Sequence, residues 1–388
     1  MKLTINTPEG TRDRLFAECL ERRQLRDRLT RLFRQRGFQE VSTPDTEFYD
    51  LYARSGCAID QERMVKVADP SGKFCVMRPD STTPIARVAA TKLRTVSLPQ
   101  RLYYDQTVYR VAGNGASREV PQCGVELIGA AGLKADLEIV VTAIDALRAC
   151  GTAQFHVELG HAGFFRDLAS QLEMAPDEVE VLRLMIEGKN FATLNNWWLS
   201  PHWGKPACEA LERLSRLFGG EEVLSQAEEL AGPTRAVDYL RQLYDELSAA
   251  GYASYVRFDL GMVHQMDYYT GVVFRGFAEG AGEPVLSGGR YDHLVEHFGR
   301  ETQATGFGVD IDAVARTLPE TSLPQLRTVV HYEPGYLAQA LEVIDSRPAG
   351  TCELSPCRTL ESSRNLARDK GVKTVLVLDK AGERMVPV

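Results

Sequence analysis

The sequence predicts an α+β protein with a sheet-based core, a helical insertion and a small α/β domain at its C-terminal end. Three observations predict this fold class. Short apolar runs typical of strands occur on both sides of residues 163–250, whereas that segment itself has leucine-rich, helix-like periodicity. Strand and helix patterns alternate again after a linker near residue 320. We therefore expect a core over residues 1–320 that includes the insertion, and a separate domain over residues 326–388.

A long helix is predicted over Thr11–Arg36. One of its faces is apolar, and Gly37 ends it. The residues on that face are Leu25, Leu29, Leu32 and Phe33. Seven arginines lie between Arg22 and Arg36, a density also found in helices that bind RNA or membranes. We favour the simpler interpretation, a solvated face that lies next to acidic partners.

The core sheet is predicted from runs that are rich in β-branched and aromatic residues. The first run follows Gly37 and ends at Pro44. The others are Phe74–Met77, Leu102–Val108, Val125–Ile128, Phe155–Leu159, Val256–Leu260 and Val272–Phe277. An amphipathic helix is predicted over Asp136–Cys150, because Gly151 follows it as a stop signal. The elements expected in the C-terminal domain are Thr328–Tyr332, Gly335–Ser346, Leu360–Lys370 and Val372–Leu378, in the order strand, helix, helix, strand.

The composition is that of an ordinary globular protein. Of the 388 residues, 44% are hydrophobic and 25% are charged, which suffices for a full core. No apolar run reaches the roughly 18 residues that span a bilayer, and the N-terminal residues lack an apolar signal segment, so we expect a cytoplasmic protein. A formal net charge of −8 does not favour a nucleic-acid surface. The eight cysteines are scattered without a CxxC pair, so reduced thiols are expected.

Four segments carry a resemblance to a known family. They are MVHQMDYYTGVVF (Met262–Phe274), RPDSTTPIARVAA (Arg78–Ala90), QCGVELIG (Gln122–Gly129) and GGRYDHLVEHFG (Gly288–Gly299). Together they resemble signature segments of histidyl-tRNA synthetases, over roughly residues 5–320. The resemblance implies a class II aminoacyl-tRNA synthetase-like core, an antiparallel sheet flanked by helices. Pro44 is similar in position to the strand proline at the dimer interface of these enzymes, which implies a homodimer core.

Three arginines that carry chemistry in the synthetases are missing from this resemblance. Activation joins a carboxylate to the α-phosphate of ATP, and fixed guanidinium groups stabilise the charge that develops. His264 stands at one of the three positions, and in gapless register Val111 and Ala313 stand at the others. Loss of one such donor typically costs about 10²–10³ in rate, so we expect no catalysis. Arg110 or Arg118 could still face a phosphate.

Six residues match the amino-acid pocket of that family. A histidine ligand needs carboxylates for its ammonium group and hydrogen-bonding partners for its imidazole. By resemblance, the candidate histidine-binding residues are Asp80, Thr82, Gln122, Glu126, Tyr268 and Tyr269. The resemblance assigns Asp80, Gln122 and Glu126 to the ammonium and backbone groups, and the two tyrosines to the ring. The alternative is that the two carboxylates are structural ion-pair members inherited with the fold.

Two further motifs suggest other chemistry. His293, Glu296 and His297 match the H-x-x-E-H zinc pattern, but a third ligand is not apparent, so a surface helix is expected. The glycines of GNGAS and SGGRY could cradle a phosphate, although neither has the context of a P-loop. Turn geometry is our interpretation of GNGAS, whereas close approach of the GGRY backbone to a ligand stays open. We expect no metal and no cofactor.

Among relatives of the synthetases, the sequence is most similar to regulatory subunits of ATP phosphoribosyltransferase. This resemblance implies a non-catalytic subunit of histidine biosynthesis. Such a subunit assembles with the short-form catalytic subunit into a hetero-octamer and relays feedback inhibition by histidine. The C-terminal domain is short for an anticodon-binding domain, which argues against a tRNA function. The alternatives are a histidyl-tRNA synthetase and a module that binds tRNA without charging it.

Overall fold

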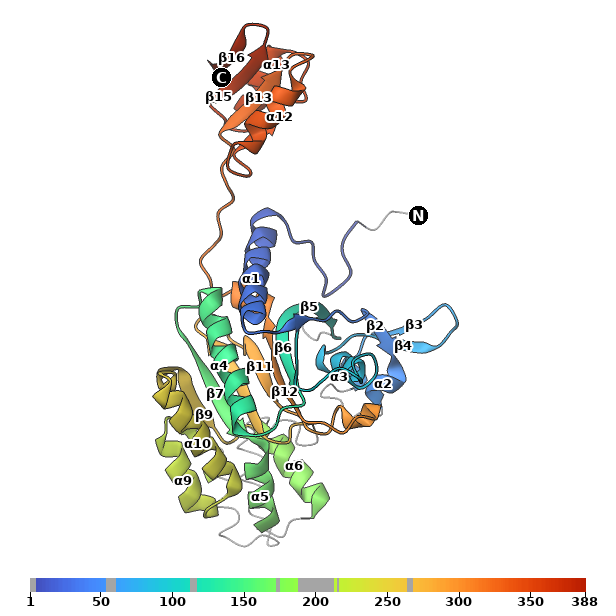
Figure 1. Ribbon diagram of the computed structural model, residues 1–388, viewed down its shortest axis with the longest axis vertical. Coiled ribbons are helices and arrows are strands. Elements are labelled where there is room, and N and C mark those ends of the chain that lie inside the picture. The colour runs from blue at the N-terminus through green and yellow to red at the C-terminus, as the bar shows by residue number, and fades with distance from the viewer. Residues whose placement is uncertain are drawn as a thin grey trace. The chain divides into compact units, whose positions relative to one another are not determined.

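The computed structural model describes residues 5–53, 61–111, 117–171, 175–187, 213–214, 216–263 and 268–388. The chain divides into two compact units. One unit comprises Met1–Asp13 and Glu21–Pro319, and the other comprises Arg14–Leu20 and Glu320–Val388. Figure 1 labels the helices and strands of both.

A sheet of nine described strands forms the core of the larger unit. In spatial order its strands are β1 (Gln39–Glu40), β5 (Gln100–Tyr109), β6 (Glu119–Ile128), β12 (Ala304–Asp310), β11 (Leu286–Arg290), β10 (Val272–Ala278), β7 (Phe155–His161), β9 (Val256–Asp259) and β8 (Phe218–Gly219). The β1–β5 and β7–β9 pairs are parallel, and the other neighbours are antiparallel. The predicted α+β architecture, a largely antiparallel sheet flanked by helices, is thereby confirmed.

Helices cover this sheet and form the insertion. The α-helices described in this unit are α1 (Phe16–Gln35), α2 (Tyr49–Ala53), α3 (Thr82–Ala90), α4 (Leu133–Cys150), α5 (Ala162–Gln171), α6 (Pro176–Glu187), α9 (Glu222–Ala231), α10 (Arg235–Ala249) and α11 (Ile311–Ala315). Short 3₁₀ turns are η1 (Gln61–Arg63), η2 (Ala253–Tyr255) and η3 (Glu296–Phe298). None of the helices described is both long and apolar enough to cross a membrane.

The two faces of the sheet bury different clusters, because successive strand residues point to opposite sides. On β5, Tyr103 joins the larger cluster, which includes apolar residues of α1 and α4. Its neighbours Leu102 and Tyr104 join a smaller cluster with the residues of α3. On β6, Val125 belongs to the larger cluster, whereas the next residue, Glu126, bonds to α3 on the other face. Glu126 therefore lies on the face of the sheet that carries the smaller cluster and α3.

Helix α1 begins five residues later than predicted. Thr11 closes a turn instead, since both its amide and its hydroxyl donate to the carbonyl of Pro8, at 3.1 and 2.7 Å. A side chain that satisfies the backbone locally competes with a helical start. The end of the helix is as predicted, because Gly37 has a φ of 82°. Three of the four residues on the predicted apolar face are buried: Leu25, Leu29 and Phe33.

Four of the seven arginines between Arg22 and Arg36, on α1 and just after it, contact the core. Arg22 pairs with Asp312 at 2.6 Å, Arg26 with Asp105 at 3.3 Å, and Arg36 with Asp145. Arg28 donates to the carbonyl oxygen of Cys150 at 2.9 Å. This arrangement agrees with a helix that lies next to acidic partners, and it leaves few arginines for an RNA surface.

Residues 163–250 are helical as predicted, over the part of the insertion that is described. Helix α10 buries one face through Leu240, Leu243 and Leu247, and its N-cap Thr234 accepts the Val237 amide at 3.2 Å. The short strand β8 within this segment was not predicted. It joins the edge of the main sheet through β9, so the insertion extends the core sheet as well as adding helices.

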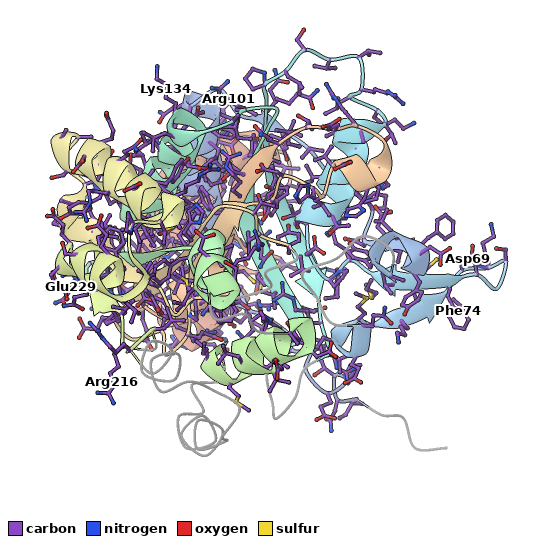
Figure 2. The ribbon with its side chains drawn as sticks, turned by 90° about the horizontal axis from the view of Figure 1, so that it is seen from below. Asp69, Phe74, Arg101, Lys134, Arg216 and Glu229 are labelled. Carbon is purple, nitrogen blue, oxygen red and sulfur yellow. The ribbon has the colours of Figure 1, made fainter. Side chains whose placement is uncertain are left out.

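The larger unit also contains a three-stranded sheet. Its order is β2 (Thr46–Phe48), β4 (Phe74–Met77) and β3 (Lys66–Ala68), all antiparallel. Two large apolar side chains on it are exposed, Phe48 at 54% and Phe74 at 74%. Figure 2 shows Phe74 and Asp69 at an outer edge, on the side opposite Glu229 of the insertion. The register pairs Phe48 with Cys75, so Phe48 and Phe74 point to opposite faces of this sheet and do not form one apolar patch.

The smaller unit has an α/β fold, as predicted, with helices on both faces of its sheet. Its strands, in spatial order, are β14 (Cys352–Leu354), β13 (Thr328–Tyr332), β15 (Thr374–Asp379) and β16 (Gly382–Pro387), and only the last pair is antiparallel. Its helices are α12 (Leu337–Asp345) and α13 (Leu360–Asp369). On β13, Val330 packs with Ala340 of α12, and Val329 packs with Ala367 of α13. Each helix therefore covers one face of the sheet. Strands β14 and β16 were not predicted.

Candidate functional site

A pocket of about 1000 Å³ lies on the α3 face of the main sheet. Its walls come from the start of α3, from strands β6, β10, β11 and β12, and from the tyrosine pair that precedes β10. All six residues predicted to bind histidine line it: Asp80, Thr82, Gln122, Glu126, Tyr268 and Tyr269. The fold therefore brings together three stretches of sequence in one concave, partly polar site, which is the usual form of a small-molecule site.

The first turn of α3 positions the first two of these residues. Asp80 accepts the Thr83 amide at 2.7 Å through one carboxylate oxygen and the Thr83 hydroxyl at 3.2 Å through the other. A helix start leaves such amides unpaired, so the carboxylate is held by the helix it caps. Thr82 turns toward the sheet, where its hydroxyl donates to Glu126 Oε1 at 2.8 Å.

Glu126 is the most buried charge-bearing group of the pocket, at 1% exposure. Thr82 donates to one of its oxygens and the Tyr291 hydroxyl donates to the other. Burial raises its pKa to about 8, although these two hydrogen bonds favour the charged form. The nearby Asp80 carboxylate adds to the rise. A pKa near 8 favours the protonated form of Glu126 at neutral pH, and a cation beside it would favour the ionised form.

Three tyrosines form an aromatic wall beside these carboxylates. The rings of Tyr268 and Tyr269 are nearly perpendicular, with centroids 4.8 Å apart. Tyr268 also stacks on Tyr291, with centroids 5.6 Å apart and planes at 16°. Burial raises the pKa of Tyr268 well above its ordinary value, so its hydroxyl stays protonated. Such a wall suits a flat, polar ring.

Glycines in the adjacent strands make room for these side chains. A Cβ at Gly306 of β12 would collide with the carboxylate of Glu126, and a Cβ at Gly289 of β11 would lie 2.7 Å from the ring of Tyr269. Both glycines lie within strands. In GGRY, the second glycine is therefore needed for the pocket wall and not for a turn.

Arginines also line the pocket, at positions near those compared with the synthetases. Arg110 lines it and donates from Nε to the Pro79 carbonyl oxygen at 3.0 Å. Burial lowers the pKa of Arg110, and the neighbouring Asp80 opposes that shift. The gapless register therefore overstated the loss at Val111, because the adjacent guanidinium reaches the pocket. Arg118 is half-buried and is not part of the pocket wall as described.

The third position at which the synthetases have an arginine is Ala313 in this chain. Ala313 is fully buried in α11, and its amide donates to Asp310 at 2.9 Å, so a guanidinium has no place there. Arg316, one turn further on, lines the pocket and pairs with Glu283. Arg316 therefore supplies a guanidinium group at the pocket that motif comparison alone did not locate.

Some predictions fall on residues outside those described. They concern His264 and most of the GNGAS glycine loop. The H-x-x-E-H segment is described and forms a turn followed by η3 rather than an α-helix. His293 and Glu296 are exposed there, with 3.7 Å between ring nitrogen and carboxylate. Among the described residues, no group of histidine, cysteine and acidic side chains has the arrangement of a metal site.

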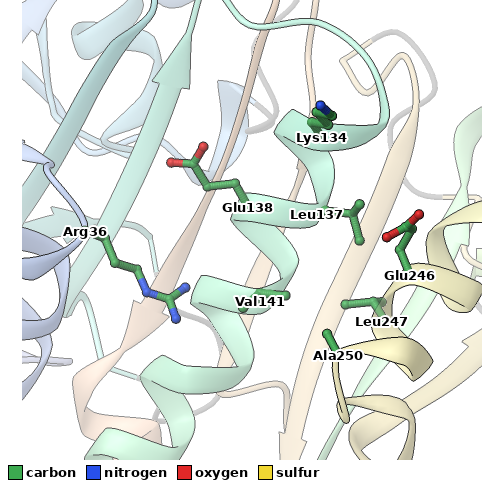
Figure 3. Close-up of a pocket in the computed structure, with 8 residues that line it drawn as sticks. All are labelled: Arg36, Lys134, Leu137, Glu138, Val141, Glu246, Leu247 and Ala250. Atoms are coloured by element: carbon green, nitrogen blue, oxygen red, sulfur yellow. The ribbon is translucent and has the colours of Figure 1, made fainter.

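A second hollow, of about 490 Å³, lies between α4 and α10. Figure 3 shows Leu137 of α4 facing Leu247 of α10 across it. Its charged rim is already neutralised in part, because Glu138 forms a bidentate pair with Arg101 at 2.6 and 2.9 Å. Unlike the first pocket, it has no convergent set of buried polar groups among the described side chains, so we take the first as the candidate site.

Comparison with known proteins gives the family. Residues 10–314 match the histidyl-tRNA synthetase family. An ATP phosphoribosyltransferase regulatory subunit of Clostridium novyi is 36% identical, over 97% of this chain and 93% of its own length. The corresponding protein of Clostridium acetobutylicum is 41% identical, over 81% and 79%. The chain belongs to the family of ATP phosphoribosyltransferase regulatory subunits.

Solved structures support the same assignment for this member of the regulatory-subunit family. A Bacillus halodurans protein described as an ATP phosphoribosyltransferase regulatory subunit/histidyl-tRNA synthetase superposes with a TM-score of 0.86 at 30% identity, covering 97% of this chain and 99% of that one. A histidyl-tRNA synthetase from Nostoc superposes with a TM-score of 0.75 at 19% identity, which shows the shared fold.

Two residues of this regulatory-subunit site were not assigned from sequence. Tyr291 lies within the GGRYD motif and bonds to Glu126, and Tyr104 lines the same pocket. Alternation along a strand could have indicated Tyr291, since it points to the opposite face from Arg290. The strand itself was not predicted there, so that signal could not be used.

Proposed function

We propose that this protein is a non-catalytic regulatory subunit of ATP phosphoribosyltransferase that binds histidine in the pocket of Glu126. It would act in the cytoplasm, at the first step of histidine biosynthesis. The family relationship supports the regulatory role. The observation that supports the ligand is the convergence of two carboxylates, an amide and an aromatic wall in one pocket, all at positions expected for a histidine site.

The chemistry of the pocket suits an amino acid with a ring. The ammonium group would lie between Asp80 and Glu126, where it would ionise the buried carboxyl group. The imidazole would pack on Tyr268 and Tyr269 and hydrogen-bond to polar groups of the wall. Arg110 offers a guanidinium for the carboxylate of the ligand.

Regulation follows from differential binding. Histidine shifts the assembled enzyme toward the quaternary state that it binds more tightly, and only by the difference between the two affinities. We propose that the partner is the short-form catalytic subunit and that a homodimer of this chain forms the core of a hetero-octamer. The regulatory-subunit names of its relatives support the existence of a catalytic partner.

The decisive experiment is turnover of the short-form catalytic subunit with and without this chain, at increasing histidine concentration. We expect activity to appear on mixing and to fall with histidine. A catalytic subunit whose rate is the same with and without this chain would refute the regulatory role. Activation without sensitivity to histidine would refute the effector assignment only.

The ligand site is tested by Asp80→Asn. Asparagine retains the oxygen that accepts the Thr83 amide, so the start of α3 is preserved while the charge is lost. We expect a histidine affinity about 10-fold to 100-fold lower, the range for losing a charge-assisted bond. Asp69→Asn is the matched control. That aspartate accepts backbone amides in the same way, but in the exposed β3–β4 turn. Equal affinities in all three proteins would place the histidine site elsewhere.

A synthetase function is the second candidate, because Arg110 and Arg316 line the pocket. It requires ATP–pyrophosphate exchange dependent on histidine, which the regulatory subunit should lack. The remaining candidate, a tRNA-binding module, requires binding that weakens steeply with salt. The engaged arginines of α1 argue against it.

A further inference from the structure

We infer that a hydrogen-bond series with a buried ion pair at its centre, running from the helical insertion, positions the wall of the ligand pocket. The series runs from Tyr239 of α10 through Asp136, Arg290 and Asp292 to Thr270, beside the tyrosine pair. Its effect on histidine binding rests on the proposed function of the pocket. The inference assigns a positioning role to residues that do not themselves touch the ligand.

The centre of this series is an ion pair inside the protein. The side chains of Asp136 on α4 and Arg290 on β11 are 2% and 7% exposed, with 2.7 Å between Oδ1 and Nη2. Arg290 Nε also lies 3.1 Å from both oxygens of that carboxylate. The Tyr239 hydroxyl donates to Asp136 Oδ2 at 2.5 Å. One carboxylate on α4 therefore joins the insertion to a strand of the pocket.

The series of hydrogen bonds continues on the other side of the Arg290 guanidinium group. Arg290 Nη1 donates to Asp292 Oδ1 at 3.1 Å, and the Thr270 hydroxyl donates to Asp292 Oδ2 at 2.9 Å. Backbone amides join the same residues. Thr270 N donates to the Arg290 carbonyl oxygen at 2.8 Å, and Asp292 N donates to Thr270 Oγ1 at 3.1 Å. Thr270 directly follows Tyr269, so this loop sets where the aromatic wall begins.

The sequence GGRYD places the pocket residue Tyr291 between two members of this hydrogen-bond series. Tyr291 lies between Arg290 and Asp292, and alternate residues of an extended segment point to opposite sides. Arg290 thus points to α4, while the Tyr291 hydroxyl donates to Glu126 in the pocket. Any shift of Arg290 moves the donor that holds the buried carboxyl group.

Within the buried Asp136–Arg290 pair, a charge that loses its partner has no solvent to replace it, so we expect these two side chains to move together. Helices α4 and α10 also lie side by side, as Figure 3 shows. A displacement of α10, for instance by a bound subunit, would therefore reach the pocket wall through Asp136. By linkage, a ligand that fixes the wall would restrain α10 to the same degree.

The test is Tyr239→Phe, which removes one hydroxyl and retains the ring. Its matched control is Tyr252→Phe, because the Tyr252 hydroxyl donates to Asp145 of the same helix α4 at 3.0 Å but lies outside the series described here. Two quantities are measured on the full-length protein, alone and with the catalytic subunit. They are histidine affinity and hydrogen exchange of the Thr270 and Asp292 amides.

We expect Tyr239→Phe to speed exchange at those two amides and to weaken histidine binding, each by about 5-fold to 10-fold, as for loss of one bond to a charged group. Tyr252→Phe should change neither. Equal effects of the two variants would mean a general loss of packing and would overturn the inference, as would no effect of Tyr239→Phe. If the wild type binds no histidine, the proposed function fails, and exchange alone decides the inference.

Asp292→Asn provides a second variant in case Tyr239→Phe does not fold. It breaks the series at the other end and retains the side-chain shape. Faster exchange of the Thr270 amide would support the inference, and unchanged exchange would overturn it.

Discussion

Glu126 is the most deeply buried charge-bearing residue of the pocket, at 1% exposure. Two hydroxyl groups donate to its carboxyl group, and burial raises its pKa to about 8. Its protonation couples the pocket to pH. A cation that enters must displace a proton, so we expect histidine affinity to rise as the pH approaches 8 from below.

Glu126→Gln tests this proton through stability. The folded-state pKa lies above the ordinary value of 4.5, so the folded protein binds the proton more tightly than the unfolded chain. That stabilisation is complete below pH 4.5 and is lost as the pH rises through 8. Glutamine remains neutral throughout. Relative to the wild type, the variant should gain stability with rising pH over this window, by at most about 1.4 kcal/mol per pH unit.

Urea unfolding of both proteins at several pH values between 5 and 8.5 measures the difference. Glu180→Gln is the control. Its hydrogen bond from Arg183 lowers the pKa of Glu180, so that group is ionised over the whole window and the difference from wild type should be constant. A constant difference for Glu126→Gln as well would show that the buried group is ionised.

Residue positions in the site were predictable to a useful degree, but their bonding was not. Asp80 and Glu126 follow from resemblance to a family motif. Nothing in the local sequence indicates that Tyr291 donates to Glu126, because that bond joins positions far apart in the chain. Arg110 is one position before Val111, the position that the motif comparison indicated. Only the structure shows that Arg110 lines the pocket.

At the scale of elements, helix α1 illustrates how context assigns a role to charge. Its arginine density alone is compatible with a nucleic-acid surface. The structure instead pairs several of them with acidic groups of the core, on the side where the helix packs. Their main contribution is to the attachment of the helix.

We expect Arg36→Ala to lower the free energy of unfolding by about 1–3 kcal/mol, because Arg36 donates both to Asp145 and to the Thr142 hydroxyl at 2.6 Å. Arg31→Ala, at an exposed position of the same helix, should stay within about 0.5 kcal/mol of wild type. Denaturant unfolding measures both changes. If the two variants lost equal stability, the ion pair would not be what attaches the helix.

Two of the strands that sequence patterns missed, β11 and β12, share a physical cause. Strand β11 reads LSGGR and β12 reads ATGFGVD, and glycine weakens strand propensity. These glycines are required by the carboxylate and the tyrosine ring that cross the sheet there. Strands without that demand, such as β4 and β13, were predicted at their observed bounds. Strand propensity therefore fails to predict these two strands, whose glycines make room for side chains of the site.

At the scale of the whole molecule, the exposed surface carries the next prediction. Phe74 is 74% exposed on β4 of the three-stranded sheet, which follows the segment ending in Pro44. If the proposed homodimer uses this surface, Phe74→Ser should weaken self-association by at least tenfold, since burial of an aromatic side chain contributes about 1.5–3 kcal/mol. Sedimentation equilibrium measures the dissociation constant.

Met385→Ser is the matched control for that experiment, because Met385 is a large apolar residue of the smaller unit that is 52% exposed. It should leave self-association unchanged. Dimers of equal strength in both variants would exclude the three-stranded sheet from the interface.

The strand order of the main sheet has a consequence for how the protein is made. Strand β12 lies between β6 and β11, and its Asp310 pairs with Gln122, which the ribosome adds much earlier. Until β12 emerges, a nascent chain has β6 and β11 with unpaired edges in the middle of the sheet, the kind of surface that aggregates. Newly made chains should therefore need chaperone protection until almost the entire larger unit has been translated. A premature stop anywhere before β12 should yield an insoluble product rather than a smaller folded one.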